Sequence, residues 1–405
     1  MQHRLKNLLQ LLFRHTPAYQ TCVAMTELIR RITAPRFDLR PQERSLAWRL
    51  HIDMPLLMGL LAVCAFGLVV LYSASGEDNR AVTNQIIRLG LGFAVMLAFA
   101  QVPPRTFRYW ALPLYTFGTV LLVLVLIFGV IANGAQRWLP VPVLGRFQPS
   151  EIMKLALPIT TAWYMSRRTL PPRWPDIIVC LLIVAIPTGL IADQPDLGTA
   201  ILVAVAGLVV LFFAGLSWKL ISVAGLGAVI AAPLMYFYVL HDYQRRRVDT
   251  LFNPEADPLG AGWNIIQSKI AIGSGGLTGK GWLNGTQSRL DFLPESSTDF
   301  ILAVIGEEFG LLGIALLLCL YLFIVGRTLY ISWQASDTFG RLLAVSLSLT
   351  FCVYVVVNMG MVSGLLPVVG VPLPLVSYGG TSAVTLLAGF GILMSIHTHR
   401  RLLPP

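Results

Sequence analysis

The sequence predicts an all-α, polytopic membrane protein with ten transmembrane helices, both termini in the cytoplasm and one large extracytoplasmic loop. Of its 405 residues, 56% are hydrophobic and only 12% are charged, whereas soluble domains average roughly 45–50% apolar and 25% charged residues. The apolar residues are gathered in runs of about 20, the length that a helix needs to cross a bilayer. This composition excludes an ordinary soluble enzyme and a disordered chain.

Ten apolar runs are the expected spans. The fourth is the shortest, and it begins with Glu151 and Lys154, so it can cross only if its polar end lies in a protected site. An even number of spans places both chain ends on the same side. The runs lie near residues 54–73, 85–101, 111–132, 151–166, 177–192, 197–216, 219–240, 300–325, 340–363 and 375–396.

The distribution of positive charge orients these spans. Residues 1–52 hold nine Lys or Arg against three acids. With the N-terminus inside, the short cytoplasmic loops and C-terminal tail hold ten Lys or Arg and the short outer loops five, as the positive-inside rule requires. The chain therefore divides into a basic cytoplasmic tail, 1–52, and a membrane domain, 53–401. The tail's charge indicates attraction to anionic lipid rather than to nucleic acid.

The segment 241–298, between the seventh and eighth spans, is the large outer loop. Its apolar anchors, such as Trp263 and Trp282, predict that it is ordered and packed on the membrane domain. It contains GSGGLTGKG (273–281), which is not a phosphate loop because Gly281 follows Lys280 where Ser or Thr is required. Two interpretations stay open: a backbone platform for an anionic or sugar ligand, and a merely tight loop.

The loop ends in PESSTDF (294–300), a helix N-terminus pattern that leads into the eighth span. Asp299 is then either a first-turn acid facing the helix dipole or a carboxylate that acts as a general base at the membrane surface. Glu151 and Lys154 can pair at i and i+3 on one helix face. The remaining polar groups fit structural and functional roles about equally well; they are Glu307, Glu308, Asp193 and Asp196.

Helix-breaking residues between 367 and 380 interrupt the apolar stretch before the tenth span. Such interruptions are tolerated in a membrane only where they line a protein-walled cavity. No His, Cys or acidic cluster has metal-ligand spacing, so no metal site is predicted. A bound divalent cation is left open as an alternative.

Several of these stretches together resemble the SEDS family (shape, elongation, division and sporulation). The resemblance covers about residues 53–401 and is closer to the elongation branch, RodA, than to the division branch, FtsW. The matching stretches are GAQRWL (134–139), QPSEIMK (148–154), QPDLGTA (194–200), the run 253–300, GEEFG (306–310) and NMGMVSGLLPVVGVPLPLVSYGGTS (358–382).

The resemblance implies a ten-helix fold and a peptidoglycan glycosyltransferase. Such an enzyme polymerises lipid II, a disaccharide-pentapeptide on undecaprenyl diphosphate, at the outer face of the bacterial cytoplasmic (inner) membrane during cell elongation and rod-shape maintenance. It works with a class B penicillin-binding protein, a transpeptidase, within the elongation machinery. The family's essential acid falls on Asp299 and its SExxK pair on Glu151 and Lys154.

Two features depart from the family pattern. Ser297 stands where the family usually has His before the Thr-Asp pair. The basic tail, 1–52, is also longer than the family pattern leads us to expect. Either Met25 is the true start, or residues 4–14 form a basic amphipathic helix on the membrane surface.

The chemistry expected of the site assigns a role to each candidate. Asp299 takes the proton from the attacking hydroxyl, and cations stand near the leaving diphosphate. A lipid II flippase would suit the ten spans and broken helices equally but needs no base. A scaffold that only activates its partner would tolerate substitution of the loop's charged residues. The expected substrate contacts are Glu151, Lys154, Arg137, Lys280, Gln287, Glu295 and Asp196.

Overall fold

The computed structural model describes residues 50–132, 135–141, 145–240, 242–256, 261–290 and 292–399. Met25 and the helix expected at 4–14 lie outside this part of the chain, and so do nearly all of the basic tail and residues 400–405.

Each of the ten expected runs contains a helix. Eight of the described helices are long and apolar enough to cross a membrane, while α9 and α7 are shorter. The chain is thus a multi-pass membrane protein. Its helices are α4 (Met54–Ala74), α5 (Asn79–Gln101), α6 (Pro104–Phe128), α7 (Ser150–Met165), α8 (Trp174–Asp193), α9 (Leu197–Phe213), α10 (Trp218–Leu234) with η1 (Met235–Val239), α11 (Asp242–Phe252), η2 (Pro254–Ala256), α12 (Ala261–Gly275), α13 (Thr286–Arg289), α14 (Ile301–Trp333), α15 (Thr338–Val362) and α16 (Thr381–Thr398).

Polar residues at the chain turns fix where several helices begin. The Asp53 carboxylate accepts from Leu56 N at 2.9 Å at the start of α4, and Asp78 does the same for Arg80 N at 2.8 Å at the start of α5. These caps satisfy backbone donors that have no partner inside the helix. The turn between α4 and α5 is therefore short and defined.

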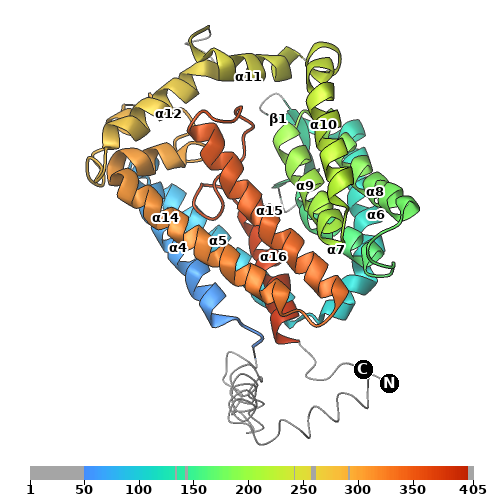
Figure 1. Ribbon diagram of the computed structural model, residues 1–405. Helices are drawn as coiled ribbons and strands as arrows, with labels where there is room; N and C mark the ends of the chain where they lie inside the picture. The colour runs from blue at the N-terminus through green and yellow to red at the C-terminus, as the bar shows by residue number, and fades with distance from the viewer. Residues whose placement is uncertain are drawn as a thin grey trace, which may run out of the picture. The chain divides into compact units, whose positions relative to one another are not determined.

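Helix α15 is the centre of the bundle. It packs against α14, α16, α9 and α7, while α16 packs on α5 and α14 on α4 (Figure 1). Figure 1 also shows α6 to α10 gathered on one side of α15 and α4, α5 and α14 on the other. Because α15 contacts both groups, it can fix the positions of side chains from one group relative to those of the other.

A small antiparallel sheet is the part of the fold that the all-α prediction missed. Its strands are β1 (Val130–Ala132), β2 (Ala135–Val141) and β3 (Gly145–Phe147), in the order β1-β2-β3. The register pairs Ile131 with Gln136 and Leu139 with Phe147. The sequence concealed β1 because Val130 and Ile131 continue the apolar run of α6, which ends at Phe128.

The large loop contains three helices, α11, α12 and α13, and it is packed as its aromatic residues predict. Figure 1 shows α11 and α12 lying across one end of the bundle. The Trp282 indole donates to Val69 O at 3.2 Å, and the Trp263 indole donates to Phe292 O at 2.7 Å. The loop is therefore a fixed cover over this end, which is the outer end in the predicted orientation.

The two described chain ends lie together at the opposite end of the bundle. The rings of His51 and His399 stack with centroids 4.1 Å apart. Nearby, Arg327 pairs with Asp53 at 2.7 Å, and His397 lies 3.0 Å from the same carboxylate. This agrees with an even number of crossings.

Candidate active site

Asp299 lies in a series of turns immediately before α14. The amides of Thr298 and Phe300 both donate to Glu295 O, at 3.1 and 3.2 Å, and Glu295 itself has a positive φ of 55°. Phe300 is the N-cap of α14. Asp299 is therefore not a first-turn acid of the helix, as one interpretation of the sequence held, but stands one residue before the cap.

The backbone around Asp299 is held by α15 and by the interrupted stretch that precedes α16. Asn358, on α15, donates from Nδ2 to Asp299 O at 2.9 Å and to Val371 O at 2.8 Å. Two residues before Asp299, Ser297 O accepts from Tyr378 N at 2.9 Å. The helix breakers between 367 and 380 thus form a wall of the site.

Gly370 lies on the carboxylate side of Asp299. It has a φ of 74°, and a Cβ built on it would be 3.5 Å from Asp299 Oδ2. A side chain here would strain the backbone, and its Cβ would be in van der Waals contact with the carboxylate. The glycine leaves open space beside the reactive oxygen.

The Asp299 carboxylate accepts no hydrogen bond from any residue that the structure describes. Burial raises its pKa to about 6, and the negative charge of Glu295 adds to this, whereas Arg137 and Arg247 oppose it. A carboxylate whose pKa lies close to neutral is ionised at physiological pH and still binds a proton appreciably. These are the properties of a general base.

Arg137 belongs to a second polar group, formed by β2, α7 and α9. Its Nη1 is 3.7 Å from Asp196 Oδ2, and Gln148 Nε2 donates to the same oxygen at 2.8 Å. Asp196 also caps α9 through Thr199 N at 3.3 Å. Arg137 therefore connects the Asp196 cap to the electrostatic surroundings of Asp299.

Glu151 and Lys154 form the ion pair that their spacing predicts. The Lys154 ammonium is 2.6 Å from Glu151 Oε1, and both side chains are nearly buried. Lys154 also lies 5.3 Å from the centre of the Tyr354 ring. Tyr354 is one turn before Asn358 on α15, so the same helix contacts this pair and holds Asp299.

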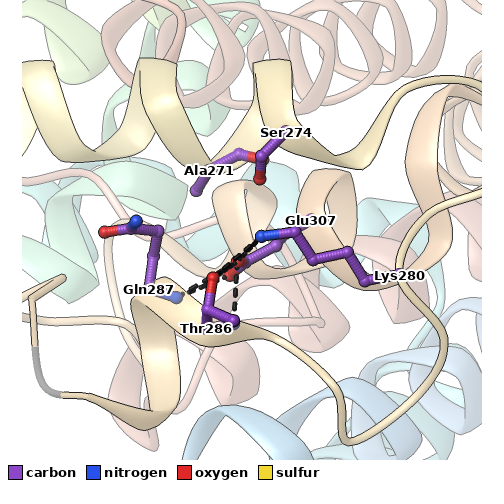
Figure 2. A network of polar contacts seen from close by, with 6 residues as sticks. All are labelled: Ala271, Ser274, Lys280, Thr286, Gln287 and Glu307. Carbon is purple, nitrogen blue, oxygen red and sulfur yellow. Dashed lines mark hydrogen bonds and ion pairs between the residues drawn. The ribbon is translucent and has the colours of Figure 1, made fainter.

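Lys280 and Gln287 take part in a separate network on α14, shown in Figure 2. Glu307 is fully buried, and its Oε1 accepts from Lys280 Nζ at 2.7 Å, from Thr286 N and Oγ1 at 2.8 Å each, and from Gln287 N at 3.1 Å. Glu308 accepts from the Ser73 hydroxyl. Both acids of α14 are thus used in structural pairing.

The glycines of 273–281 allow this loop to touch the backbone of α14. A Cβ on Gly275 would lie 1.9 Å from Gly306 O, and one on Gly279 would lie 2.1 Å from Glu308 O. The amides of Lys280 and Gly281 donate to the carbonyls of Glu307 and Glu308. The structure supports the tight-loop interpretation, because these amides are occupied by α14.

The structure brings Asp299, Glu295 and Arg137 together, and it brings Asp196 to Arg137 and Glu151 to Lys154. Sequence patterns did not point to Asn358, Tyr354 or Arg247 as site residues, and they pointed to Gly370 only as part of the helix-breaking stretch at 367–380. Asn358 could have been found, because a buried amide inside an apolar span needs partners. Arg247 could not, because nothing in the sequence relates α11 to Asp299. Within the described residues, no group of three or more His, Cys, Asp or Glu side chains is arranged to hold a metal ion.

Comparison with known proteins gives consistent matches. Residues 53–402 match the family model of the FtsW, RodA and SpoVE cell cycle proteins. The chain is 53% identical over 363 residues to the peptidoglycan glycosyltransferase MrdB of Escherichia coli K12, covering 90% of this chain and 98% of that protein. It is 38% identical over 368 residues to the probable peptidoglycan glycosyltransferase FtsW of Trichlorobacter lovleyi, covering 87% and 94%.

Two solved structures match over most of the chain. One comes from a study of the coordination of polymerization and crosslinking by a peptidoglycan synthase complex. It superposes with a TM-score of 0.76 at 32% identity, covering 86% of this chain and 98% of that chain. The other is the rod shape determining protein RodA of Thermus thermophilus, with a TM-score of 0.65 at 30% identity, covering 85% and 96%.

Proposed function

The chain belongs to the FtsW/RodA/SpoVE family and is a peptidoglycan glycosyltransferase of cell elongation; we propose that it polymerises lipid II with Asp299 as its general base. The acceptor is the 4-hydroxyl of a GlcNAc residue, and the donor is a second glycan carried on undecaprenyl diphosphate. The proposal extends to the inner membrane as location, to ten crossings of it, and to a class B penicillin-binding protein as partner.

The proposed reaction is a single displacement. The hydroxyl oxygen attacks the anomeric carbon of the donor, and the bond from that carbon to the diphosphate oxygen breaks with its electron pair. The hydroxyl proton moves to an Asp299 carboxylate oxygen. A positioned base contributes roughly 10²–10⁴-fold to such a step.

The observation that carries this proposal is the open carboxylate of Asp299. Its backbone is fixed by Asn358, its oxygen faces Gly370, and no described group donates to it. Its raised pKa, about 6, suits proton abstraction near neutral pH. A flippase would have no use for an unpaired carboxylate held in this way.

The leaving diphosphate needs positive charge close to the reacting carbon. Arg137 and Arg247 are the cations that act on Asp299, so they are the proposed partners of that diphosphate. Arg137 Nε is buried and has no hydrogen-bond partner among the described groups, so it is free to donate. Lys154 and Lys280 each already pair with a glutamate, and in this proposal they support the site.

The test is glycan-chain formation from purified lipid II by the purified protein, with and without the transpeptidase partner. Asp299→Asn removes the charge and basicity but keeps the shape, so chain formation should fall by roughly 100-fold or more. Lipid II binding and co-purification of the partner should survive.

The matched control is Glu255→Gln, an exposed acid in the same outer segment, which should behave as the wild type. Near-normal polymerisation by Asp299→Asn would refute the base assignment. Lipid II translocation without polymerisation by the wild type would favour the flippase.

A further inference from the structure

A polar pocket lies between the α4–α5 turn and the segment that leads to Asp299. It has a volume of about 860 Å³, within the range of small-molecule sites. Ser297, two residues before Asp299, lines it together with Tyr378, so the pocket borders the segment that carries Asp299. Its other polar walls come from Glu77, Asp78, Arg80, Asn84 and Arg289.

The acids of this pocket are already engaged. Glu77 pairs with Arg289, and Asp78 accepts from Arg80 N at 2.8 Å as the cap of α5. The guanidinium of Arg80 has no carboxylate partner within the described part of the chain. The pocket therefore has a cation available for a ligand.

A second arginine without a described carboxylate partner, Arg88, lies farther along α5. Arg80, Asn84 and Arg88 are spaced by four residues and so lie on one face of the helix. Arg88 stacks 4.5 Å from the centre of the Tyr378 ring, and it has no described carboxylate partner either. We call Arg80, Asn84 and Arg88 the α5 stripe.

The α5 stripe is electrostatically unfavourable unless it meets an anion. Arg80 is in the first turn of α5, where the positive end of the helix dipole disfavours a cation. Both arginines are also at the outer end of the helix in the predicted orientation, where positive charge is sparse. Planar guanidinium groups recognise phosphate oxygens in a bidentate manner.

The donor and the acceptor each carry a diphosphate, and the reaction places the two at different distances from the base. The donor's diphosphate leaves from the reacting carbon and so lies next to the base, near Arg137 and Arg247. The acceptor's hydroxyl must also reach the base, but its own diphosphate is a disaccharide away. A pocket that begins at Ser297 and leads to unpaired arginines fits the second arrangement.

We propose that this pocket and the α5 stripe bind the lipid-linked acceptor, with its sugars in the pocket and its diphosphate on Arg80 and Arg88. The inference rests on the proposed function, since it names the acceptor subsite of the same reaction. Asn84 and Tyr378 offer hydrogen bonds and an aromatic face to the sugars.

The test uses the purified full-length protein and lipid II. Arg80→Gln with Arg88→Gln should raise the lipid II concentration for half-maximal chain formation at least roughly tenfold, because hydrogen bonds to charged groups are strong. The maximal rate should change much less, because Asp299 is untouched. Arg80→Lys with Arg88→Lys should recover part of the loss, since it keeps the charge.

The matched control is Arg105→Gln with Arg108→Gln, the same charge change at the other end of the membrane, which should have no such effect. Thermal unfolding shows whether each variant is folded; where the double Gln variant is not, Arg80→Gln and Arg88→Gln are measured singly, and each should show part of the same rise. An unchanged half-maximal concentration, or a loss of maximal rate alone, would overturn the acceptor assignment.

Direct binding separates this inference from the proposed function. Lipid II binding should weaken in the Gln double variant even if the wild type forms no glycan, in which case only the proposed function fails. Phosphatidylglycerol vesicles are the second probe. Equal loss of lipid II and phosphatidylglycerol binding would identify the α5 stripe as a general lipid-headgroup site and overturn the proposal.

Discussion

Two acids eight residues apart, Glu307 and Asp299, show how differently one region of the chain treats a carboxylate. Glu307 is fully buried on α14 and accepts from Lys280, from both donors of Thr286 and from the Gln287 amide. Asp299 is half-buried just before α14 and accepts from no described group. The Glu307 carboxylate is fully hydrogen-bonded, whereas the Asp299 carboxylate has no described donor.

The difference matches the structural role of Glu307 and the catalytic role that we propose for Asp299. Buried polar groups normally find partners, and a carboxylate left without them is costly. Around Asp299 the polar contacts are made to the backbone: Asn358 binds its carbonyl oxygen and leaves the side chain free. The fold thus fixes the position of Asp299 without neutralising its charge.

Removing the fully hydrogen-bonded acid should cause the largest loss of stability. Glu307→Gln leaves the Lys280 ammonium without its counter-ion and removes the negative charge from the acceptor of three further hydrogen bonds. Loss of one partner of a fully buried pair costs about 3–5 kcal/mol; Lys280 is partly exposed, so the cost should be smaller, and the yield of folded protein in membranes should fall. Glu307→Gln with Lys280→Met should partly restore the yield. If the yield of the double variant is no higher than that of Glu307→Gln alone, the unpaired Lys280 charge is not the main cause of the loss.

The same logic applies to the pair on α7. Lys154→Met leaves Glu151 charged and buried, so folded yield should fall, and Glu151→Gln with Lys154→Met should recover part of it. Equal yields for the single and double variants would contradict the pairing. Restored yield without restored polymerisation would show that Lys154 also contacts substrate.

Substitution of Asn358 tests whether the reactivity of the Asp299 carboxylate depends on the hydrogen bond that fixes its backbone. Asn358→Leu is similar in size but loses the bonds to Asp299 O and Val371 O. The protein should still fold, with a loss of about 1–3 kcal/mol, while kcat falls roughly tenfold and KM changes little. Asn358→Asp has at most one donor, when its carboxyl is protonated, and so should not fully rescue kcat. A normal kcat in both variants would show that these bonds do not position the base.

The smallest effect is expected at Ser297, where the family usually has His. Ser297 faces the acceptor pocket and contributes its carbonyl oxygen to Tyr378 N. Because that bond is made by the backbone, Ser297→His should retain or increase polymerisation, measured as initial rate per folded protein. A collapse of activity would mean that the surroundings of the base differ here from those of the family.

The sequence predicts what depends on apolar length, on charge and on local spacing. Each apolar run contains a helix, and eight of the described helices are long and apolar enough to cross a membrane. Glu151 pairs with Lys154, as two residues three apart on one helix can. The sheet at 130–147 was missed because β-strand residues continue an apolar run.

Contacts between distant segments could not be read in this way. Lys280 was expected near the leaving diphosphate, but its pairing with Glu307 depends on how a loop 27 residues away in sequence folds onto the kinked α14. The positions of Asn358 and Arg247 relative to Asp299 also depend on tertiary packing. Spacing along the chain contains no information about such contacts.

The pH dependence of kcat/KM for lipid II polymerisation is the most direct measurement of whether Asp299 acts as the base. With a pKa of about 6, Asp299 is mostly ionised at neutral pH and becomes protonated as the pH falls. A base must be ionised, so the wild-type rate should be level above this pKa and fall about tenfold per pH unit below it. Asp299→Asn should be slow and should lack this inflection. A wild-type rate that stays level well below pH 6, or the same inflection in Asp299→Asn, would contradict the assignment.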